Sequence, residues 1–212
     1  MSILRIFLLI SLIASFTCHS KDFDKRNTIL VLGDSLSAAY GIELEQGWVN
    51  LLQNKLDINY SNDNSWHIIN ASVSGETTAG GLARLPGLLE EFKPTICMIE
   101  LGANNGLRGQ AITDIREHLD KMVQLCNQAG RTLLLGIRLP PNYGRKYTQE
   151  FDNSFNIIAT KHDIPVVPFI LEGIATEEKY FQADGIHPTA EAQSIILENI
   201  WPTLSTLLDS AQ

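Results

Sequence analysis

A serine and an Asp/His pair lie near opposite ends of this chain, and together they could perform nucleophilic catalysis. Ser35 is the central residue of the stretch 33–37 (GDSLS), and the pair lies in the stretch 184–188 (DGIHP). A serine hydroxyl is a weak nucleophile until a base takes its proton, and an imidazole is a dependable base when a third group fixes its tautomer. The spacing from Asp184 to His187 supplies a base and its orienting carboxylate within one turn. The three residues are therefore candidates for the catalytic triad of an ester hydrolase.

Other groups could hold the charge that such a reaction creates. When a hydroxyl adds to an acyl carbon, the carbonyl oxygen becomes an oxyanion, and each donor aimed at it typically contributes about 10²- to 10³-fold in rate. Gly75 offers a backbone N–H that no side chain obstructs. Asn104 offers a side-chain amide, with Gly102 and Gly106 on either side of it. We expect an oxyanion hole made by the N–H groups of Ser35 and Gly75 and the amide of Asn104.

Alternating apolar runs and helical stretches predict the fold that positions these residues. We predict five strands, at residues 28–32, 67–71, 95–101, 132–137 and 165–169. We predict helices at residues 47–56, 77–92, 112–129, 145–162 and 189–208. The runs are rich in Ile, Val and Leu without strict alternation, which is typical of a parallel sheet covered on both faces. The pattern predicts an α/β fold, a three-layer α/β/α sandwich around a five-stranded parallel sheet with right-handed crossovers.

The candidate residues fall where such a sheet forms its sites, at the carboxyl ends of the strands. Ser35 follows the first predicted strand, Gly75 the second and Asn104, in a loop, the third. Asp184 and His187 precede the last predicted helix. We therefore expect folding to bring all five residues to one edge of the sheet.

These blocks resemble those of a known family, the SGNH hydrolases, also called GDSL lipases and esterases. The resemblance rests on residues 33–37, Gly75, residues 102–104 (GAN) and residues 184–188. It implies a flavodoxin-like fold and an acyl-enzyme mechanism without metal or organic cofactor. It also implies that Ser35 is the nucleophile, that Asp184 and His187 complete the triad, and that the three donors named above form the oxyanion hole.

Three further stretches are similar to one branch of this family: residues 83–86 (ARLP), 105–109 (NGLRG) and 138–144 (RLPPNYG). That resemblance implies hydrolysis of acyl thioesters such as acyl-CoA, of lysophospholipids and of aryl esters. One position departs from the pattern, because the family commonly has Asp after the block-three asparagine and this chain has Asn105. The change removes a carboxylate that could brace the loop.

Three side chains on the same predicted rim could bind the acyl chain. Leu107 lies close to Asn104 in sequence, and Leu139 and Tyr143 follow the fourth predicted strand. We predict that these three residues line a shallow acyl groove. The alternative is that Leu107 and Leu139 pack beneath their own loops.

The first twenty residues differ from the rest of the chain. Arg5 precedes an uncharged apolar stretch at residues 6–16, followed by a short polar segment. Such a stretch is too short to span a bilayer, which takes about 20 residues. We predict a signal peptide at residues 1–20, a single mature domain at residues 21–212, and a periplasmic or secreted protein without stable membrane insertion.

Composition limits the partners. The formal net charge is −8, and without residues 1–20 there are 15 basic against 24 acidic side chains. Such a surface repels phosphate backbones, so we expect no nucleic acid as a partner. We expect a monomer whose partner is a small acyl ester or thioester substrate. Cys97 and Cys126 lack the spacing of a metal site; they could pair in an oxidising compartment or pack as buried thiols.

Three other functions fit part of the pattern. A carbohydrate esterase of the same family, which removes acetyl groups, needs a smaller and more polar pocket, and the apolar Leu107 and Leu139 argue against it. A non-catalytic binding protein has no need of a proton-relay trio. A nucleotide-binding domain could use residues 33–37 as a phosphate loop. That loop, however, carries Asp34 and has no Lys or Arg nearby.

Overall fold

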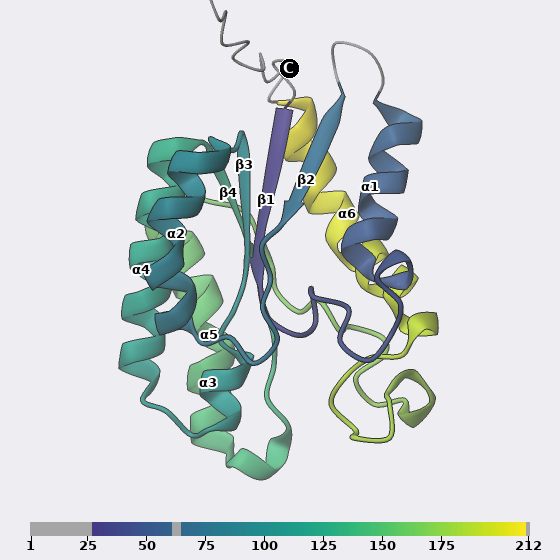
Figure 1. Cartoon of the computed structure of the whole chain (residues 1–212). Coiled ribbons are helices and arrows are strands. Elements are labelled where there is room, and N and C mark those ends of the chain that lie inside the picture. Colours follow the sequence, from purple (N-terminus) through teal and green to yellow (C-terminus); the bar gives the residue numbers. More distant parts are fainter. Residues whose placement is uncertain (1–26, 61–64, 211–212) are drawn as a thin grey trace, which may run out of the picture.

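The computed structural model describes residues 27–60 and 65–210, and five strands of this part form one parallel sheet (Figure 1). The strands are β1 (Asn27–Gly33), β2 (Trp66–Asn70), β3 (Ile96–Glu100), β4 (Arg131–Leu135) and β5 (Val166–Val167). Their order across the sheet is β2-β1-β3-β4-β5, and every neighbouring pair is parallel. The predicted α/β fold with a five-stranded parallel sheet is confirmed.

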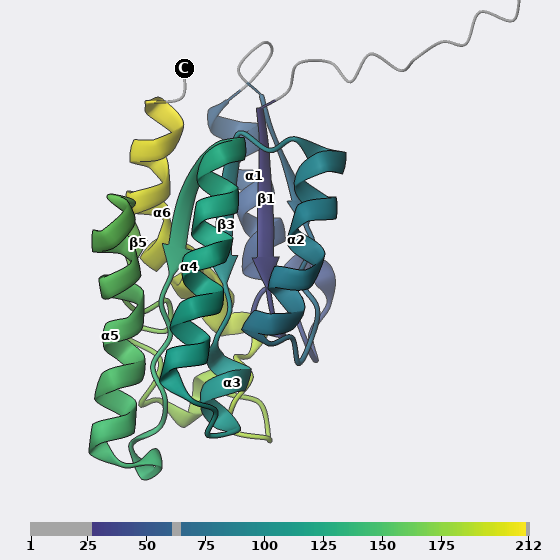
Figure 2. The same cartoon turned by 90° about the vertical axis from the view of Figure 1, so that its left-hand side faces the viewer.

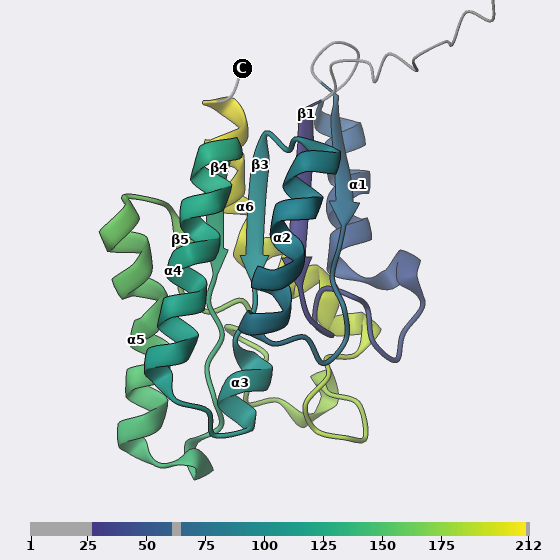
Figure 3. The ribbon, with the colours of Figure 1, turned by 60° about the vertical axis from the view of Figure 1, so that its left-hand side comes forward.

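Helices cover both faces of the sheet. On one face lie α1 (Trp48–Asn59) and α6 (Gln193–Asp209). On the other, α2 (Thr78–Phe92), α4 (Ile112–Ala129) and α5 (Arg145–His162) stand side by side, as Figure 2 shows. A short helix that the sequence did not predict, α3 (Ala103–Leu107), follows β3 directly (Figure 3). Single 3₁₀ turns form at Leu44–Gln46, Pro141–Tyr143, Glu178–Tyr180 and Ala190–Ala192.

The central strands are mostly apolar because helices exclude water from both faces of the sheet. Ile29, Leu30 and Val31 of β1 are fully buried, and every residue of β3 is buried. The α4 helix buries the stripe Ile112, Ile115, Leu119, Met122, Val123 and Cys126, at the three- and four-residue spacing of one helix face. This packing fixes the strands whose carboxyl ends carry the candidate residues.

Strand β5 is shorter than predicted for a local chemical reason. Pro165 and Pro168 flank Val166 and Val167 and carry no N–H, so neither can donate to the neighbouring strand. Only Val166 and Val167 pair with β4.

The strand order reverses direction at the carboxyl ends of β1 and β3. The chain passes from β1 to β2 on one side and then to β3 on the other, and ligands of such sheets bind where the direction reverses. The segment between β5 and α6, yellow-green in Figure 1, reaches the same end of the sheet. The described ends of the chain lie at the opposite end, where the Arg131 guanidinium at the start of β4 hydrogen-bonds to Ser210.

The predicted signal peptide, residues 1–20, lies outside the described residues. Within the described ranges, none of the helices has the length and apolar character needed to cross a bilayer.

Candidate active site

Ser35 lies on a tight turn directly after β1. The Asp34 carboxylate accepts a hydrogen bond from the Leu36 N–H at 3.0 Å, and the Asp34 carbonyl accepts one from Ala38. A Cβ on Gly33 would lie 2.7 Å from Ser37 and 2.9 Å from a Glu100 carboxylate oxygen, so only glycine fits there. Asp34 and Leu36 are buried, whereas Ser35, just after the carboxyl end of β1, is half-buried. The turn therefore presents one hydroxyl to solvent and holds its neighbours in the core.

Asp184 and His187 form a compact loop around one carboxylate. Asp184 Oδ1 accepts the backbone N–H groups of Ile186 and His187, each at 3.0 Å, and Oδ2 lies 2.6 Å from His187 Nδ1. The N–H of Ile186, the His187 ring and the His187 N–H lower the pKa of Asp184 to about 2. Asp184 is thus an ionised group that can fix the tautomer and the orientation of the imidazole.

The structure brings the three predicted triad residues into one chain of contacts. His187 Nε2 lies 3.0 Å from Ser35 Oγ, across 152 positions of sequence. With Nδ1–H donated to Asp184, Nε2 carries the lone pair that can accept the serine proton. The arrangement can therefore activate Ser35 as a nucleophile.

Two residues that sequence reasoning missed join the loops that carry Ser35 and His187. The Gln182 side chain donates to the carbonyls of Tyr40 at 2.8 Å and Pro188 at 3.0 Å. The Tyr40 ring packs against the His187 imidazole with 4.3 Å between ring centroids. No spacing rule marks a glutamine or a tyrosine for such a role, so the sequence carried no signal for either.

The Asn104 amide points to the Ser35 turn from the first turn of α3, and not from a loop as expected. Its Nδ2 donates to Asp34 Oδ2 at 3.0 Å, which leaves its second N–H for another acceptor. Gly75 adopts φ +79°, which favours glycine, and its carbonyl accepts from the Arg108 guanidinium at 3.2 Å. Arg108 thus links the Gly75 loop to the segment that follows Asn104.

Asn105 braces this region with its amide. The side chain is buried, Oδ1 accepts the Thr78 N–H at 2.9 Å, and Nδ2 donates to Gln110 Oε1 at 2.6 Å. A carboxylate could accept the first bond but could not donate the second. Asn105 therefore connects α3 to α2 through a bond that an aspartate could also make, and connects α3 to Gln110 through a bond that needs the amide.

The three predicted groove residues lie together around α3. The Tyr143 hydroxyl donates to the Leu107 carbonyl at 3.0 Å. Leu139 is only 8 % exposed, and a Cβ on Gly106 would lie 2.7 Å from its side chain. Leu107 is half-buried, so it presents more surface than Leu139 does.

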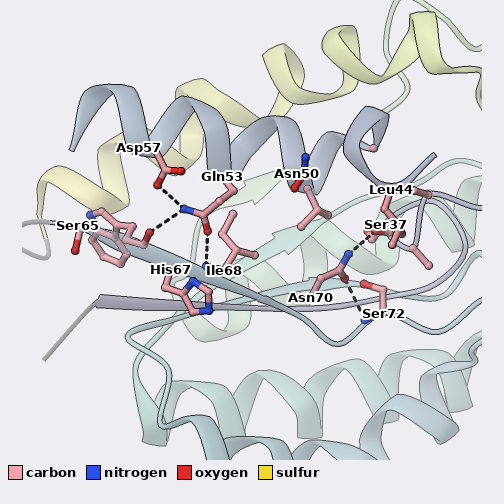
Figure 4. Close-up of a pocket in the computed structure, with 15 residues that line it drawn as sticks. Ser37, Leu44, Asn50, Gln53, Asp57, Ser65, His67, Ile68, Asn70 and Ser72 are labelled. Atoms are coloured by element: carbon pink, nitrogen blue, oxygen red, sulfur yellow. Dashed lines mark hydrogen bonds between the residues drawn. The ribbon is translucent and has the colours of Figure 1, made fainter. Parts of the chain in front are cut away.

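A hollow of about 650 Å³ lies between α1 and the outer edge of β2 (Figure 4). The Gln53 side chain satisfies two backbone groups at that edge of β2. Its amide N–H donates to the Trp66 carbonyl at 3.0 Å, and its amide oxygen accepts the Ile68 N–H at 2.8 Å. A second hollow, of about 460 Å³, lies beside Gln182 and Gly185. None of the triad residues lines either of these two hollows.

The described part of the chain holds no group of three or more His, Cys, Asp or Glu side chains that could bind a metal ion.

Known proteins resemble this chain over most of its length. The profile of the GDSL-like lipase/acylhydrolase family matches residues 31–195. The chain is 50 % identical over 183 residues to esterase TesA of Pseudomonas aeruginosa, covering 85 % of this chain and 89 % of that protein. It is 41 % identical to an arylesterase of Vibrio mimicus, covering 90 % and 94 %. It is 38 % identical to thioesterase 1/protease 1/lysophospholipase L1 of Escherichia coli K12, covering 86 % of each.

Solved structures give the same result. A crystal structure of TesA matches with a TM-score of 0.81 and 49 % identity, over 85 % of this chain and 99 % of that one. The psychrotrophic esterase EstA from Pseudoalteromonas sp., in a structure inhibited by monoethylphosphonate, matches with a TM-score of 0.80 and 42 % identity, over 86 % and 99 %.

Proposed function

Because this chain belongs to the GDSL-like lipase/acylhydrolase family and is a serine hydrolase that acts on ester bonds, we propose that Ser35 is its nucleophile. His187 is the general base and Asp184 orients it. The observation that carries this assignment is the pair of contacts made by the His187 ring, 3.0 Å to Ser35 Oγ and 2.6 Å to Asp184 Oδ2.

The reaction passes through an acyl-enzyme. Ser35 Oγ attacks the acyl carbon while its proton moves to His187 Nε2, and the ionised Asp184 stabilises the resulting imidazolium. The N–H groups of Ser35 and Gly75 and the free N–H of Asn104 hold the oxyanion. Collapse expels the alkoxide or thiolate, which takes the proton from His187. Water then attacks the acyl-enzyme by the same steps and releases the acid and free Ser35.

The substrates are acyl esters and thioesters, including aryl esters, acyl-CoA and lysophospholipids. The names of the relatives, which include an arylesterase and a thioesterase 1/lysophospholipase L1, support this range. They do not favour a polysaccharide acetyl esterase. Leu107 and Tyr143 line the acyl groove and Leu139 forms its floor, consistent with their clustering around α3.

The groove can be tested by shortening its most exposed member. Leu107→Ala should lower kcat/KM for long-chain p-nitrophenyl esters by about tenfold relative to acetyl esters, because lost apolar contact weakens only the longer chain. An equal loss on both would remove Leu107 from the groove.

The protein acts as an exported monomer. Residues 1–20 direct export and are then removed, and the mature domain works in the periplasm or outside the cell. Among the described residues, the large exposed apolar side chains lie on separate helices and turns (Leu44, Ile58 and Ile157) or in separate loops (Tyr40, Val73 and Ile186), which supports a monomer. N-terminal sequencing of the mature protein and its elution volume on gel filtration test these two points.

A fluorophosphonate probe tests the nucleophile directly, and the phosphonate-inhibited relative supports this choice. The wild type should be labelled at Ser35, His187→Ala should be labelled far more slowly, and Ser35→Ala should not be labelled. Ser205→Ala on α6 is the matched serine control and should be labelled like the wild type. Labelling of Ser35→Ala would overturn the assignment.

A further inference from the structure

Two carboxyl groups that the mechanism does not use lie beneath the Ser35 turn. Asp34 is 1 % exposed, and Glu100, the last residue of β3, is fully buried. Glu100 Oε2 accepts the Ser37 hydroxyl at 2.9 Å and the Asp34 N–H at 3.3 Å. Both oxygens of Asp34 are occupied as well, by the Leu36 N–H and by the Asn104 amide.

One carboxyl oxygen of this cluster has no hydrogen-bond partner among the described residues. Glu100 Oε1 is buried, and none of the described residues donates a hydrogen bond to it. A buried carboxylate oxygen without a donor is costly, whereas an oxygen that carries a proton needs only an acceptor. The Asp34 carboxyl, whose charge and side-chain hydrogen bonding raise the pKa of Glu100, can serve as that acceptor.

Electrostatics place the proton on Glu100. Neither carboxyl forms an ion pair with a lysine or arginine of the described residues, so two charges here would repel each other in a dry site. Burial, and then the charge of Asp34, raise the pKa of Glu100 well above its usual value. Burial raises the pKa of Asp34 to about 6. The Leu36 N–H and the Asn104 amide stabilise its charge and so lower this pKa, but they offset only part of the effect of burial. Because both oxygens of Asp34 have donors and one oxygen of Glu100 has none, a proton held by the pair is favoured on Glu100.

We propose that Glu100 is a neutral carboxylic acid that donates its Oε1 proton to Asp34, and that this pair is the positioning unit for the Asn104 amide. This inference rests on the proposed role of Asn104 in the oxyanion hole. An ionised Asp34 can only accept, so it requires the nitrogen of the Asn104 amide, and not its oxygen, to face it. A protonated Asp34 could instead donate, and the amide could then turn its carbonyl oxygen toward Asp34 and its two N–H groups away. Glu100 prevents this by keeping the proton.

Two substitutions separate a neutral acid from a charged one. Glu100→Gln keeps the size, the neutrality and a donor for Asp34, so we expect kcat within about threefold of the wild type. Glu100→Met keeps the length of the side chain and removes both donor and acceptor, so kcat should fall about tenfold or more with little change in KM. If Glu100→Gln is as impaired as Glu100→Met, Glu100 acts as a carboxylate and the proposal is wrong.

A double-mutant cycle tests whether Glu100 acts through Asn104. In the Asn104→Ala background, Glu100→Met should cause little further loss of kcat, because the group that it positions is already absent. Independent, multiplicative losses would mean that Glu100 only supports the fold, and would overturn the proposal.

Infrared difference spectroscopy keeps the proposal testable even if Glu100→Met fails to fold. The difference between wild type and Glu100→Gln at neutral pH should contain the carbonyl band of a protonated carboxylic acid, and a carboxylate band in its place would overturn the proposal. Labelling of Ser35 by the fluorophosphonate in the same samples separates the two hypotheses. A wild type that is not labelled refutes the proposed function, whereas a labelled wild type without the acid band refutes this inference alone.

Discussion

The Gln182 side chain donates a hydrogen bond to the Tyr40 carbonyl at 2.8 Å, and these residues lie 142 positions apart in sequence. Tyr40 belongs to the turn that carries Ser35, and Gln182 belongs to the loop that carries His187. This hydrogen bond therefore joins the segment that carries the nucleophile to the segment that carries the base.

Removing this contact should slow catalysis without unfolding the protein. Gln182→Ala loses two hydrogen bonds, each worth about 1 kcal/mol, so kcat/KM for p-nitrophenyl esters should fall about fivefold or more. Gln124→Ala, on the exposed face of α4, is the matched control and should leave kcat/KM unchanged. Equal kcat/KM in the two variants would mean that the loops are held together by other contacts.

Asp184→Asn should leave the loop in place and disable the base. The Asn oxygen can still accept the N–H groups of Ile186 and His187, but the charge that selects the His187 tautomer is lost. We expect kcat to fall by about 10⁴-fold, the size of effect that a lost orienting carboxylate has in serine hydrolases. Asp163→Asn, at the end of α5, should keep full activity because asparagine tolerates its positive φ. A loss below about tenfold for Asp184→Asn would argue against an orienting role.

The ring of Tyr40 should matter more than its hydroxyl. Tyr40→Phe keeps the face that packs against the His187 imidazole, so kcat should stay within about twofold of the wild type. Tyr40→Ala removes this packing and leaves Asp184 to orient the imidazole alone, so kcat should fall about tenfold. Steady-state kinetics with one ester substrate decide this, and a large loss in Tyr40→Phe would instead implicate the hydroxyl.

Stability should depend on pH through Asp34. Its pKa is about 6 in the folded protein against 3.8 in the reference state, mainly because of burial. Its contribution is therefore fully present below about pH 3.8 and is lost as the pH rises through about 6, by about 3 kcal/mol. The raised pKa of Glu100 changes the free energy of unfolding in the same direction as that of Asp34. The charge of His187 lowers the pKa of Asp34 and so reduces the effect of Asp34. Asp184, with a pKa of about 2, changes the free energy of unfolding in the opposite direction at lower pH.

Urea unfolding from about pH 4 to pH 8 measures this dependence. The free energy of unfolding of Asp34→Asn, relative to that of the wild type, should rise across this range, because only the wild type loses the contribution of Asp34. A constant difference would show that Asp34 titrates normally.

The two core cysteines should be inert in the native state. Cys97 on β3 and Cys126 on α4 are free and buried, and a hydrogen bond between the thiols, together with burial, raises the pKa of Cys126. Maleimide should therefore modify neither cysteine until the mature protein is unfolded, and then modify both. Modification of the native protein at the rate of the unfolded one would show that the α4 contact opens readily.

The sequence was sufficient to predict most of the fold because each buried strand corresponds to an apolar run in the sequence. The run in β3 is buried at every position, and the predicted bounds of α4 and α5 match the structure. The prediction for β5 was too long because two prolines interrupt the pairing inside an apolar run. Helix α3 was missed because it has only five residues and two asparagines with a glycine, which rank low as helix formers.

Some residues of the candidate site could likewise be predicted from the sequence, and others could not. Ser35, Asp184 and His187 could be predicted because their chemistry is carried by residue types at short spacings. Gln182 and Glu100 could not, because each acts through contacts with residues that are distant in sequence. Only the fold decides which buried carboxyl lies beneath the Ser35 turn.

The described ends of the chain lie at the amino ends of the strands, away from the rim that carries the triad. A tether that leaves the fold beside Asn27 or Ser210 would therefore leave substrate access unobstructed. The enzyme could be displayed on a bead or a cell surface with its catalytic face outward, with the attachment beside either of these two residues.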